Sequence, residues 1–191
     1  PAQEIINLAQ AAPQTLVVVD ELYEAFTGDS ALPLIDFSKI RNVIILRSLS
    51  KTAGLAGLRI GFAISNEEVI DNISRVIGPY DVNTFAVKAA FAALDDQEYI
   101  NKYVKEVNQA KQWIKDKLIL NKVNHHIDGG NYFLIWPRKG ANKTESILKS
   151  NGILTRNMSG KMLLDNCLRV SIGTKSQMER FWEVFIQEEK S

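Results

Sequence analysis

Short apolar runs alternate with amphipathic stretches along this chain, which is the pattern of an α/β protein. Two runs rich in β-branched residues, 15–19 and 42–46, predict strands of a parallel sheet with both faces buried, and a third run, 59–64, predicts another such strand. Apolar residues at helical spacing predict a helix over 4–11 and a long helix over 97–120, about 36 Å long at 1.5 Å per residue.

Polar residues indicate where further helices begin. Ser65–Glu68 has the sequence of a capping box, Asn83 can cap an alanine-rich helix that runs through Leu94, and Thr174–Gln177 is a second capping box. The helix after the second box carries four large apolar residues on one face, and we expect them in the core: Met178, Phe181, Trp182 and Phe185. The other predicted elements are strands at 132–136 and 167–172 and a helix at 144–150.

These elements predict an α/β fold in two parts. We expect residues 1–95 to form a partial large domain, with a mostly parallel sheet and helices, and residues 96–191 to form a smaller α+β domain led by the long helix. That helix is expected to act as a spine between the domains. A length of 191 residues suits one large domain or two small ones.

Composition and charge exclude several classes of function. The formal net charge is +1, so no global field favours nucleic acid, and no apolar run approaches the length that spans a membrane. The single cysteine, Cys167, cannot form an internal disulfide, is expected to be a buried small hydrophobe, and is consistent with the cytoplasm. The adjacent pair His125 and His126 would point to opposite faces of a strand, and we predict no metal site.

The candidate chemistry lies where the second predicted strand ends. Ser48, Ser50 and Lys51 lead into a glycine-rich turn, and Arg59 follows eight residues after the lysine. A nucleophilic lysine must be partly desolvated, and the end of a buried strand provides that setting. Arginine offers a planar, charged fork for an oxyanion, while glycines let the backbone approach a ligand closely.

A second group of candidates follows the first predicted strand. Ligands of open parallel sheets lie beyond the carboxyl ends of the strands, so Asp20 and Lys51 would face one crevice. A carboxylate there can keep a heterocyclic nitrogen protonated, and Tyr23 can donate to a phenolic oxygen. These parts match the needs of pyridoxal phosphate: a Schiff-base lysine, a carboxylate for the pyridinium nitrogen and a phosphate cup. A Walker loop fits poorly, because its lysine follows the glycines.

The segment Ser48–Gly61 resembles the Schiff-base motif of fold-type-I aminotransferases, in particular the histidinol-phosphate aminotransferase branch. Val17–Tyr23 resembles that family's aspartate strand, Pro79–Thr84 its stretch after the lysine segment, and Asn166–Thr174 its carboxylate-binding arginine strand. The matches run in the family's order along nearly the whole chain. The resemblance therefore implies a PLP-dependent transaminase of histidine biosynthesis, a homodimer that transfers an amino group between histidinol phosphate and 2-oxoglutarate.

The resemblance also implies a role for each residue. Lys51 would form the Schiff base and move the proton at the substrate α-carbon, and Asp20 and Tyr23 would bind the ring nitrogen and ring hydroxyl. The cofactor phosphate and the substrate would be bound by the remaining candidates: Ser48, Ser50 and Arg59 for the phosphate, Arg169 for the substrate carboxylate and Arg156 for its distal group.

The sequence departs from the family in ways that leave alternatives open. Arg156-Asn157-Met158 stands where the family has an arginine-aspartate pair, and an upstream Asn-Pro-rich motif and a ring-stacking aromatic are missing. We therefore expect the chain to be the C-terminal part of one nearly twice as long. A threonine-phosphate decarboxylase, an aromatic or aspartate aminotransferase, a cofactor-binding regulatory domain and an inactive fragment remain as alternatives.

Overall fold

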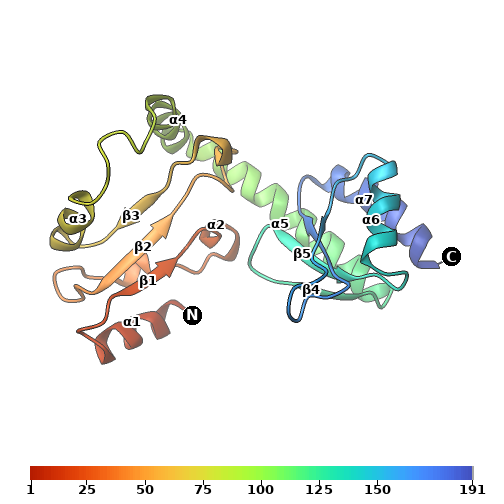
Figure 1. The fold of residues 1–191 in the computed structure, drawn as a ribbon, viewed down its shortest axis with the longest axis horizontal. Coiled ribbons are helices and arrows are strands. Elements are labelled where there is room, and N and C mark those ends of the chain that lie inside the picture. The colour runs from red at the N-terminus through yellow and green to blue at the C-terminus, as the bar shows by residue number, and fades with distance from the viewer. Residues whose placement is uncertain (191) are drawn as a thin grey trace. The chain divides into compact units, whose positions relative to one another are not determined.

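The computed structural model describes residues 1–190, and the chain divides into two compact units, Pro1–Asn101 and the part from Lys102 onward (Figure 1). Both units mix helices and strands. The predicted division at 95/96 into a cofactor domain and a small domain stays a prediction. The first unit contains α1 (Ala2–Ala11), β1 (Val17–Asp20), α2 (Glu24–Thr27), a 3₁₀ turn at Leu32–Leu34, β2 (Val43–Arg47), a 3₁₀ turn at Ala56–Leu58, β3 (Phe62–Ile64), α3 (Glu67–Ser74) and α4 (Thr84–Asp95).

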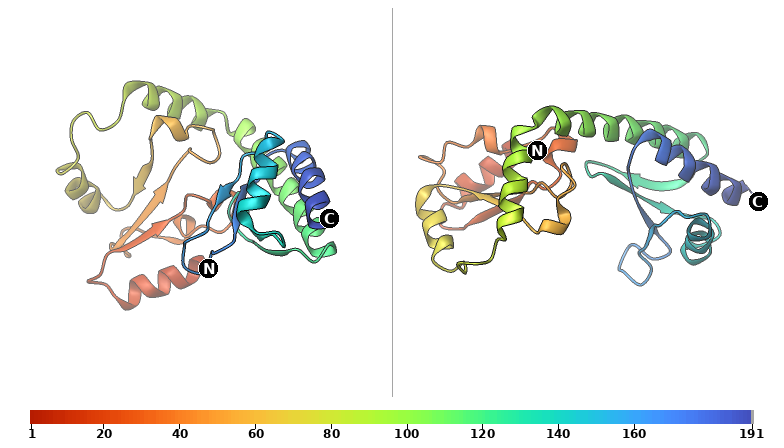
Figure 2. Two further views of the ribbon diagram at one scale, coloured as in Figure 1. Left: turned by 45° about the vertical axis from the view of Figure 1, so that its right-hand side comes forward. Right: turned by 90° about the horizontal axis from the view of Figure 1, so that it is seen from above.

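The sheet of the first unit has the order β1-β2-β3, with β1 and β2 parallel and β3 antiparallel to β2. The helix α1 covers one face of this sheet, where Ile6 and Ala9 pack in one cluster with Val43 and Ile45 of β2 (Figure 2). Of the three runs expected to be parallel strands buried on both faces, only β2 is largely buried, and Val18 of β1 is 55% exposed.

The third run departs most from its prediction. Its first residues are not in a strand, because Arg59 adopts a left-handed backbone conformation with φ of 55° after the 3₁₀ turn. The strand β3 begins only at Phe62. The connection from β2 contains no crossover helix, so the chain turns back and pairs antiparallel, as a parallel return would have required a longer crossover.

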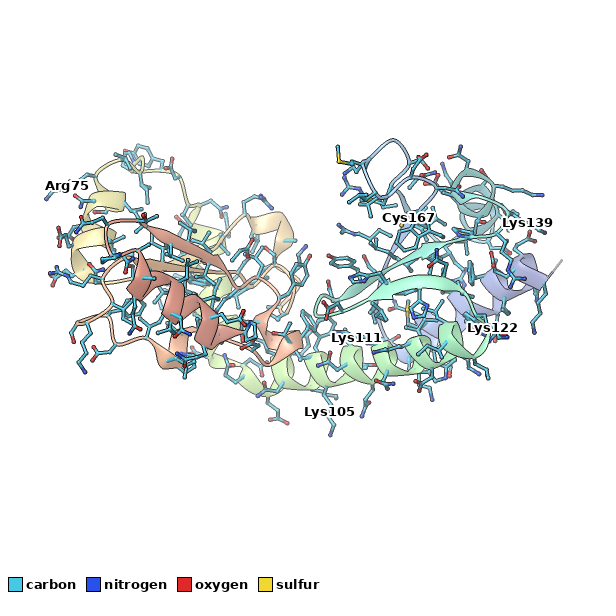
Figure 3. The ribbon with its side chains drawn as sticks, turned by 90° about the horizontal axis from the view of Figure 1, so that it is seen from below. Arg75, Lys105, Lys111, Lys122, Lys139 and Cys167 are labelled. Atoms are coloured by element: carbon cyan, nitrogen blue, oxygen red, sulfur yellow. The ribbon has the colours of Figure 1, made fainter. Side chains whose placement is uncertain are left out.

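The second unit is built on an antiparallel sheet of order β4-β5-β7-β6. Its elements are most of α5 (Gln97–Leu120), then β4 (Asn124–Ile127), β5 (Tyr132–Trp136), α6 (Ala141–Ser150), β6 (Arg156–Asn157), β7 (Leu168–Ser171) and α7 (Lys175–Lys190). The strand β4 is at the edge, and it holds the two histidines on opposite faces, as expected for alternating side chains. On α5, Lys111 points toward the strands and Lys105 points away from them (Figure 3).

The core of the second unit is aromatic. Phe181 of α7 stacks on Phe185 with ring centroids 5.4 Å apart and meets Phe133 of β5 edge to face at 5.7 Å. All four residues predicted for the buried face of the last helix are buried: Met178, Phe181, Trp182 and Phe185. Cys167 is fully buried, as predicted, and this burial raises the pKa of its thiol.

Helix caps follow the sequence closely, with one exception. The side chain of Asn83 accepts a hydrogen bond from the backbone N–H of Ala86, as predicted for the cap of α4. Thr174 and Gln177 form the reciprocal bonds of a capping box before α7. Before α3, however, Asn66 is the N-cap, because the Ser65 hydroxyl donates instead to the Val43 carbonyl oxygen at 2.6 Å.

None of the helices in residues 1–190 is long and apolar enough to cross a membrane. The same residues contain no group of three or more His, Cys, Asp or Glu side chains arranged to hold a metal ion.

Candidate active site

Asp20 is the last residue of β1, and its side chain is exposed at the carboxyl end of the sheet. One carboxylate oxygen, Oδ1, accepts a hydrogen bond from the Leu22 backbone N–H at 3.0 Å, which fixes the side chain over the turn that follows. Within residues 1–190 no hydrogen bond or ion pair occupies Oδ2. Asp20 therefore serves the turn and still presents one oxygen to a ligand.

Lys51 and Tyr23 lie near each other, although they follow different strands. The Nζ atom of Lys51 is 5.8 Å from the centroid of the Tyr23 ring. Lys51 is half-buried in a turn whose flanking residues Leu49 and Thr52 are buried, and no carboxylate within the described part of the chain lies within salt-bridge distance of its amino group. The buried residues on either side hold the turn in place, and the Lys51 amine forms no ion pair with a carboxylate in residues 1–190.

A pocket lies at the carboxyl end of β1, beside Asp20. Asp20 and Tyr23 line a pocket together with Pro1 and Ala2 of the α1 terminus, and Lys51 is not among its lining residues. Tyr23 lines this pocket, and its ring centroid lies 5.8 Å from the Lys51 amine. That Asp20 and Lys51 face one crevice stays a prediction.

Ser48 and Ser50 are brought together by the turn. Their hydroxyl oxygens are 2.8 Å apart, and the Ser48 hydroxyl also accepts from the Ser50 backbone N–H at 3.1 Å. The Ser48 oxygen lies 3.2 Å from the carbonyl oxygen of Ile60, which it can reach as a donor. Since each hydroxyl has a single proton, Ser48 can donate to the Ser50 oxygen or to the Ile60 carbonyl oxygen, but not to both at once. Two adjacent half-buried hydroxyls with protons to redirect suit the oxygens of a phosphate.

The backbone next to Arg59 lies near Ser48 and Ser50, but the Arg59 side chain is directed elsewhere. Its guanidinium is exposed and donates to the Ala56 carbonyl oxygen at 3.2 Å, and it makes no hydrogen bond to Ser48 or Ser50. The next residues bring the backbone in tightly, because a Cβ at Gly61 would lie 3.2 Å from the carbonyl oxygen of Arg47. Glycine at this position lets the arginine-bearing turn close against the end of β2.

The two arginines predicted to bind the substrate lie in the second unit. Arg156 of β6 and Arg169 of β7 are direct cross-strand partners, so their side chains emerge side by side on one face of the sheet. The guanidinium of Arg169 lies over the Tyr132 ring at 4.9 Å. Neither arginine has a carboxylate within salt-bridge distance in residues 1–190.

Sequence reasoning missed an ion pair between the two strand ends. Glu21 follows Asp20, Arg47 precedes Ser48, and the guanidinium Nη2 of Arg47 is 2.9 Å from Oε2 of Glu21. The available signal was a pair of opposite charges directly beyond two neighbouring buried strands.

Comparisons with known proteins agree with this arrangement. The chain matches the family model for aminotransferase class I and II over residues 1–185. It is 36% identical over 184 residues to the histidinol-phosphate aminotransferase of Geotalea uraniireducens, a match that covers 95% of this chain and 52% of that protein. The chain spans about half the length of the curated relatives it matches.

Two solved structures share the fold. Histidinol-phosphate aminotransferase from Sinorhizobium meliloti, in complex with pyridoxal-5'-phosphate, has a TM-score of 0.81 at 27% identity and covers 100% of this chain and 53% of its own. L-threonine-O-3-phosphate decarboxylase from Porphyromonas gingivalis has a TM-score of 0.78 at 25% identity, covering 99% and 59%. These likenesses confirm the predicted α/β fold class, of which the chain represents a part.

Proposed function

We propose a function for this chain from its family: it belongs to the aminotransferase class I and II family, as its motifs predicted. We propose that it carries the cofactor lysine of a pyridoxal-phosphate-dependent transaminase that transfers an amino group from histidinol phosphate to 2-oxoglutarate, or the reverse. The observation that carries the proposal is the Lys51 turn, which follows β2 directly and lies against Tyr23 from the neighbouring strand end. We also propose that the enzyme is a cytoplasmic homodimer.

The residues of the first unit suit the cofactor. Ser48 and Ser50 offer adjacent hydroxyls to the phosphate, and Arg59, which precedes the Ile60 carbonyl that faces Ser48, would add its charge. The free Oδ2 of Asp20 suits a protonated ring nitrogen, and Tyr23 suits the ring hydroxyl. When bound, pyridoxal phosphate supplies an electron sink for negative charge at the substrate α-carbon.

The chemical work of the chain's own residues follows from these positions. The amine of Lys51 would attach the cofactor covalently, and once displaced by the substrate amine it would take and return the proton at the substrate α-carbon. Asp20 would hold the proton on the ring nitrogen. Burial of Leu49 and Thr52 on either side of Lys51 restricts the turn, so that the amine returns to the same place in each half-reaction.

The two arginines of the second unit suit the anionic ends of both substrates. Histidinol phosphate ends in a phosphate, whereas 2-oxoglutarate carries two carboxylates. Guanidinium groups bind either anion with paired hydrogen bonds, and Arg156 and Arg169 stand side by side without an acidic partner in residues 1–190. We propose that this arginine pair receives the phosphate or the carboxylate in alternate half-reactions, with Tyr132 holding the Arg169 guanidinium in place.

The test of the cofactor lysine is chemical. The full-length protein is incubated with pyridoxal phosphate, reduced with borohydride and digested, and the modified peptide is identified by mass. We expect the label on Lys51, with loss of label and of turnover in Lys51→Arg. The exposed Lys88 of α4 provides the matched control, since Lys88→Arg should change neither. A label elsewhere, or full turnover in Lys51→Arg, would contradict the assignment.

The substrate is tested separately with a panel of amino donors and 2-oxoglutarate. We expect histidinol phosphate to be preferred over aspartate and aromatic amino acids. The second candidate reaction is decarboxylation of threonine phosphate, favoured by the likeness to the Porphyromonas gingivalis enzyme, and release of carbon dioxide would identify it. Labelling of Lys51 without turnover of any donor would favour a regulatory domain or an inactive fragment.

A further inference from the structure

Beyond the last backbone hydrogen bond between β1 and β2, the two strand ends are joined by side chains. That last bond runs from the Glu21 N–H to the Leu46 carbonyl oxygen at 2.9 Å. After it the chains part, since one enters α2 and the other the Lys51 turn. The side chains of Glu21 and Arg47 then continue the connection, with Nε and Nη2 of Arg47 lying 3.2 and 2.9 Å from Oε2 of Glu21.

The carboxylate of Glu21 is almost fully enclosed and fully engaged. Its side chain is 6% exposed. Besides Arg47, its Oε2 accepts from the Ser30 hydroxyl at 2.9 Å, and its Oε1 accepts from the Ala31 backbone N–H at 2.7 Å. A buried carboxylate that accepts four hydrogen bonds has little freedom to move. It fixes the end of β1 to the loop that follows α2.

Arg47 makes the connection from the other strand. Its Nη1 lies 3.2 Å from Oε1 of Glu24, and its Nη2 lies 2.8 Å from the Ser30 hydroxyl. The planar guanidinium thus reaches Glu21, Glu24 and Ser30 at once, through donors whose directions are fixed relative to one another. A lysine ammonium has the charge but cannot hold three partners in this plane.

The neighbours of this pair in the sequence are the groups that the proposed function assigns to the cofactor. Asp20 precedes Glu21, and Ser48 follows Arg47. Because peptide units are planar and turn only at φ and ψ, a shift of either charged residue is passed directly to the adjacent residue. The ion pair therefore lies directly beside the residues that we propose for the ring nitrogen and for the phosphate.

Stability alone does not explain such a pair. A buried ion pair can often be replaced by apolar residues without loss of stability, because both charges must first be removed from water. What an apolar pair cannot supply is a fixed direction for each partner. We infer that Glu21 and Arg47 are positioning residues that hold the Asp20 end of β1 and the Ser48–Lys51 turn at the separation that the cofactor spans. This inference rests on the proposed function, because it concerns the same site.

The experiment compares Glu21→Gln and Arg47→Lys with the wild type in the full-length protein. Three quantities are measured: the Kd for pyridoxal phosphate by absorbance titration, the fraction of Lys51 trapped by borohydride at saturating cofactor, and the Tm without cofactor. We expect the Kd to rise by about tenfold or more in each variant, the usual cost of losing a charge-assisted contact that organises a site. The trapped fraction should fall as well.

Matched controls separate positioning from stability. Arg41 and Glu68 form an exposed ion pair in the same unit, with Nη2 to Oε2 at 2.6 Å, and Glu68→Gln should leave the Kd within about twofold. Val43→Ala creates a cavity at the start of β2 and lowers the Tm. Because Val43 lies at the other end of β2 from Arg47, the Kd of this variant should also stay near the wild-type value. Arg47→Lys keeps the positive charge, and its Kd for pyridoxal phosphate should still rise, because a lysine cannot bind the same three partners.

The outcomes are distinct. Should Glu21→Gln and Arg47→Lys lower the Tm as Val43→Ala does and keep the wild-type Kd, the pair is merely structural and the inference is overturned. A wild-type protein that binds no pyridoxal phosphate overturns the proposed function, and this inference with it. If both charge variants fail to fold, Ser30→Ala, which retains the ion pair but removes one shared partner, decides: a Kd raised about threefold supports the inference and an unchanged Kd refutes it.

Discussion

The hydroxyl of Ser48 has both a structural and a proposed ligand-binding role, and Ser48→Ala should separate the two. The substitution removes an oxygen that lies 2.8 Å from the Ser50 hydroxyl, accepts from the Ser50 N–H at 3.1 Å and lies 3.2 Å from the Ile60 carbonyl oxygen. In the protein without cofactor, these half-buried groups then lose one partner. In the protein with cofactor, the phosphate loses a donor.

The two losses differ in size. A hydrogen bond between neutral groups contributes about 1 kcal/mol to folding, so Ser48→Ala should lower the free energy of unfolding by about that amount. A hydrogen bond to a charged group contributes about 1.5–3 kcal/mol, which corresponds to a Kd for pyridoxal phosphate raised roughly 10- to 150-fold. Binding should therefore suffer more than folding.

Ser65→Ala is the matched control. Its hydroxyl also makes one bond to a strand backbone, to the Val43 carbonyl oxygen at 2.6 Å, but at the opposite end of β2. Denaturant unfolding should show a similar loss of about 1 kcal/mol for both variants, whereas absorbance titration should show a raised Kd only for Ser48→Ala. Equal unfolding losses with unchanged Kd values in both would mean that Ser48 only supports its turn, and the phosphate assignment would be wrong.

Two further predictions concern the fold. Phe185 is fully buried and stacks on Phe181, so Phe185→Ala should lower the free energy of unfolding by about 3–5 kcal/mol in a denaturant titration, and a loss below about 1 kcal/mol would contradict the packing. Hydrogen bonds from Ser38 and Lys39 lower the pKa of Asp36 from 3.8 to about 2, so the stability it contributes is present above pH 3.8 and is lost as the pH falls through about 2. The stability difference between wild type and Asp36→Asn, followed by unfolding from pH 5 to pH 2, should therefore shrink over that window, and a difference independent of pH would refute this.

Local signals were enough to predict the helices longer than one turn, whereas the short α2 was not predicted. The bounds of α5 agree with the predicted 97–120, and the caps at Asn83 and Thr174 form the bonds that their sequences indicate. A cap needs only a hydroxyl or amide within three residues of the N–H groups it satisfies, so the sequence contains the whole interaction. The cap before α3 was assigned one residue too early, because the Ser65 hydroxyl bonds to a strand 22 residues away.

Strand pairing was less predictable, since it depends on residues distant in sequence. The run 59–64 has the composition of a buried strand, yet its orientation follows from a connection without a crossover helix, which composition does not reveal. The strands β4 and β6 were missed: β6 has two residues and β4 carries two adjacent histidines, so neither shows an apolar alternation.

The candidate site was predictable one strand end at a time. Asp20, Ser48 and Lys51 could be proposed because each follows an apolar run, and β1 and β2 do lie side by side in parallel. The ion pair of Glu21 with Arg47 could not, because it requires the register that places Asp20 opposite Leu46. Register depends on two segments together, so the sequence of either strand alone does not reveal it.

The same reasoning applies to the arginines of the second unit. The register of β6 against β7 places Arg156 directly opposite Arg169, and like charges directly opposite each other destabilise a sheet. Neither guanidinium has a carboxylate nearby in residues 1–190, and the Tyr132 ring relieves only the charge on Arg169. An anion between the two would turn this repulsion into attraction at both arginines. The pair thus lowers the stability of the sheet, and binding of an anionic ligand would account for its presence, which is why we propose a substrate role for both arginines.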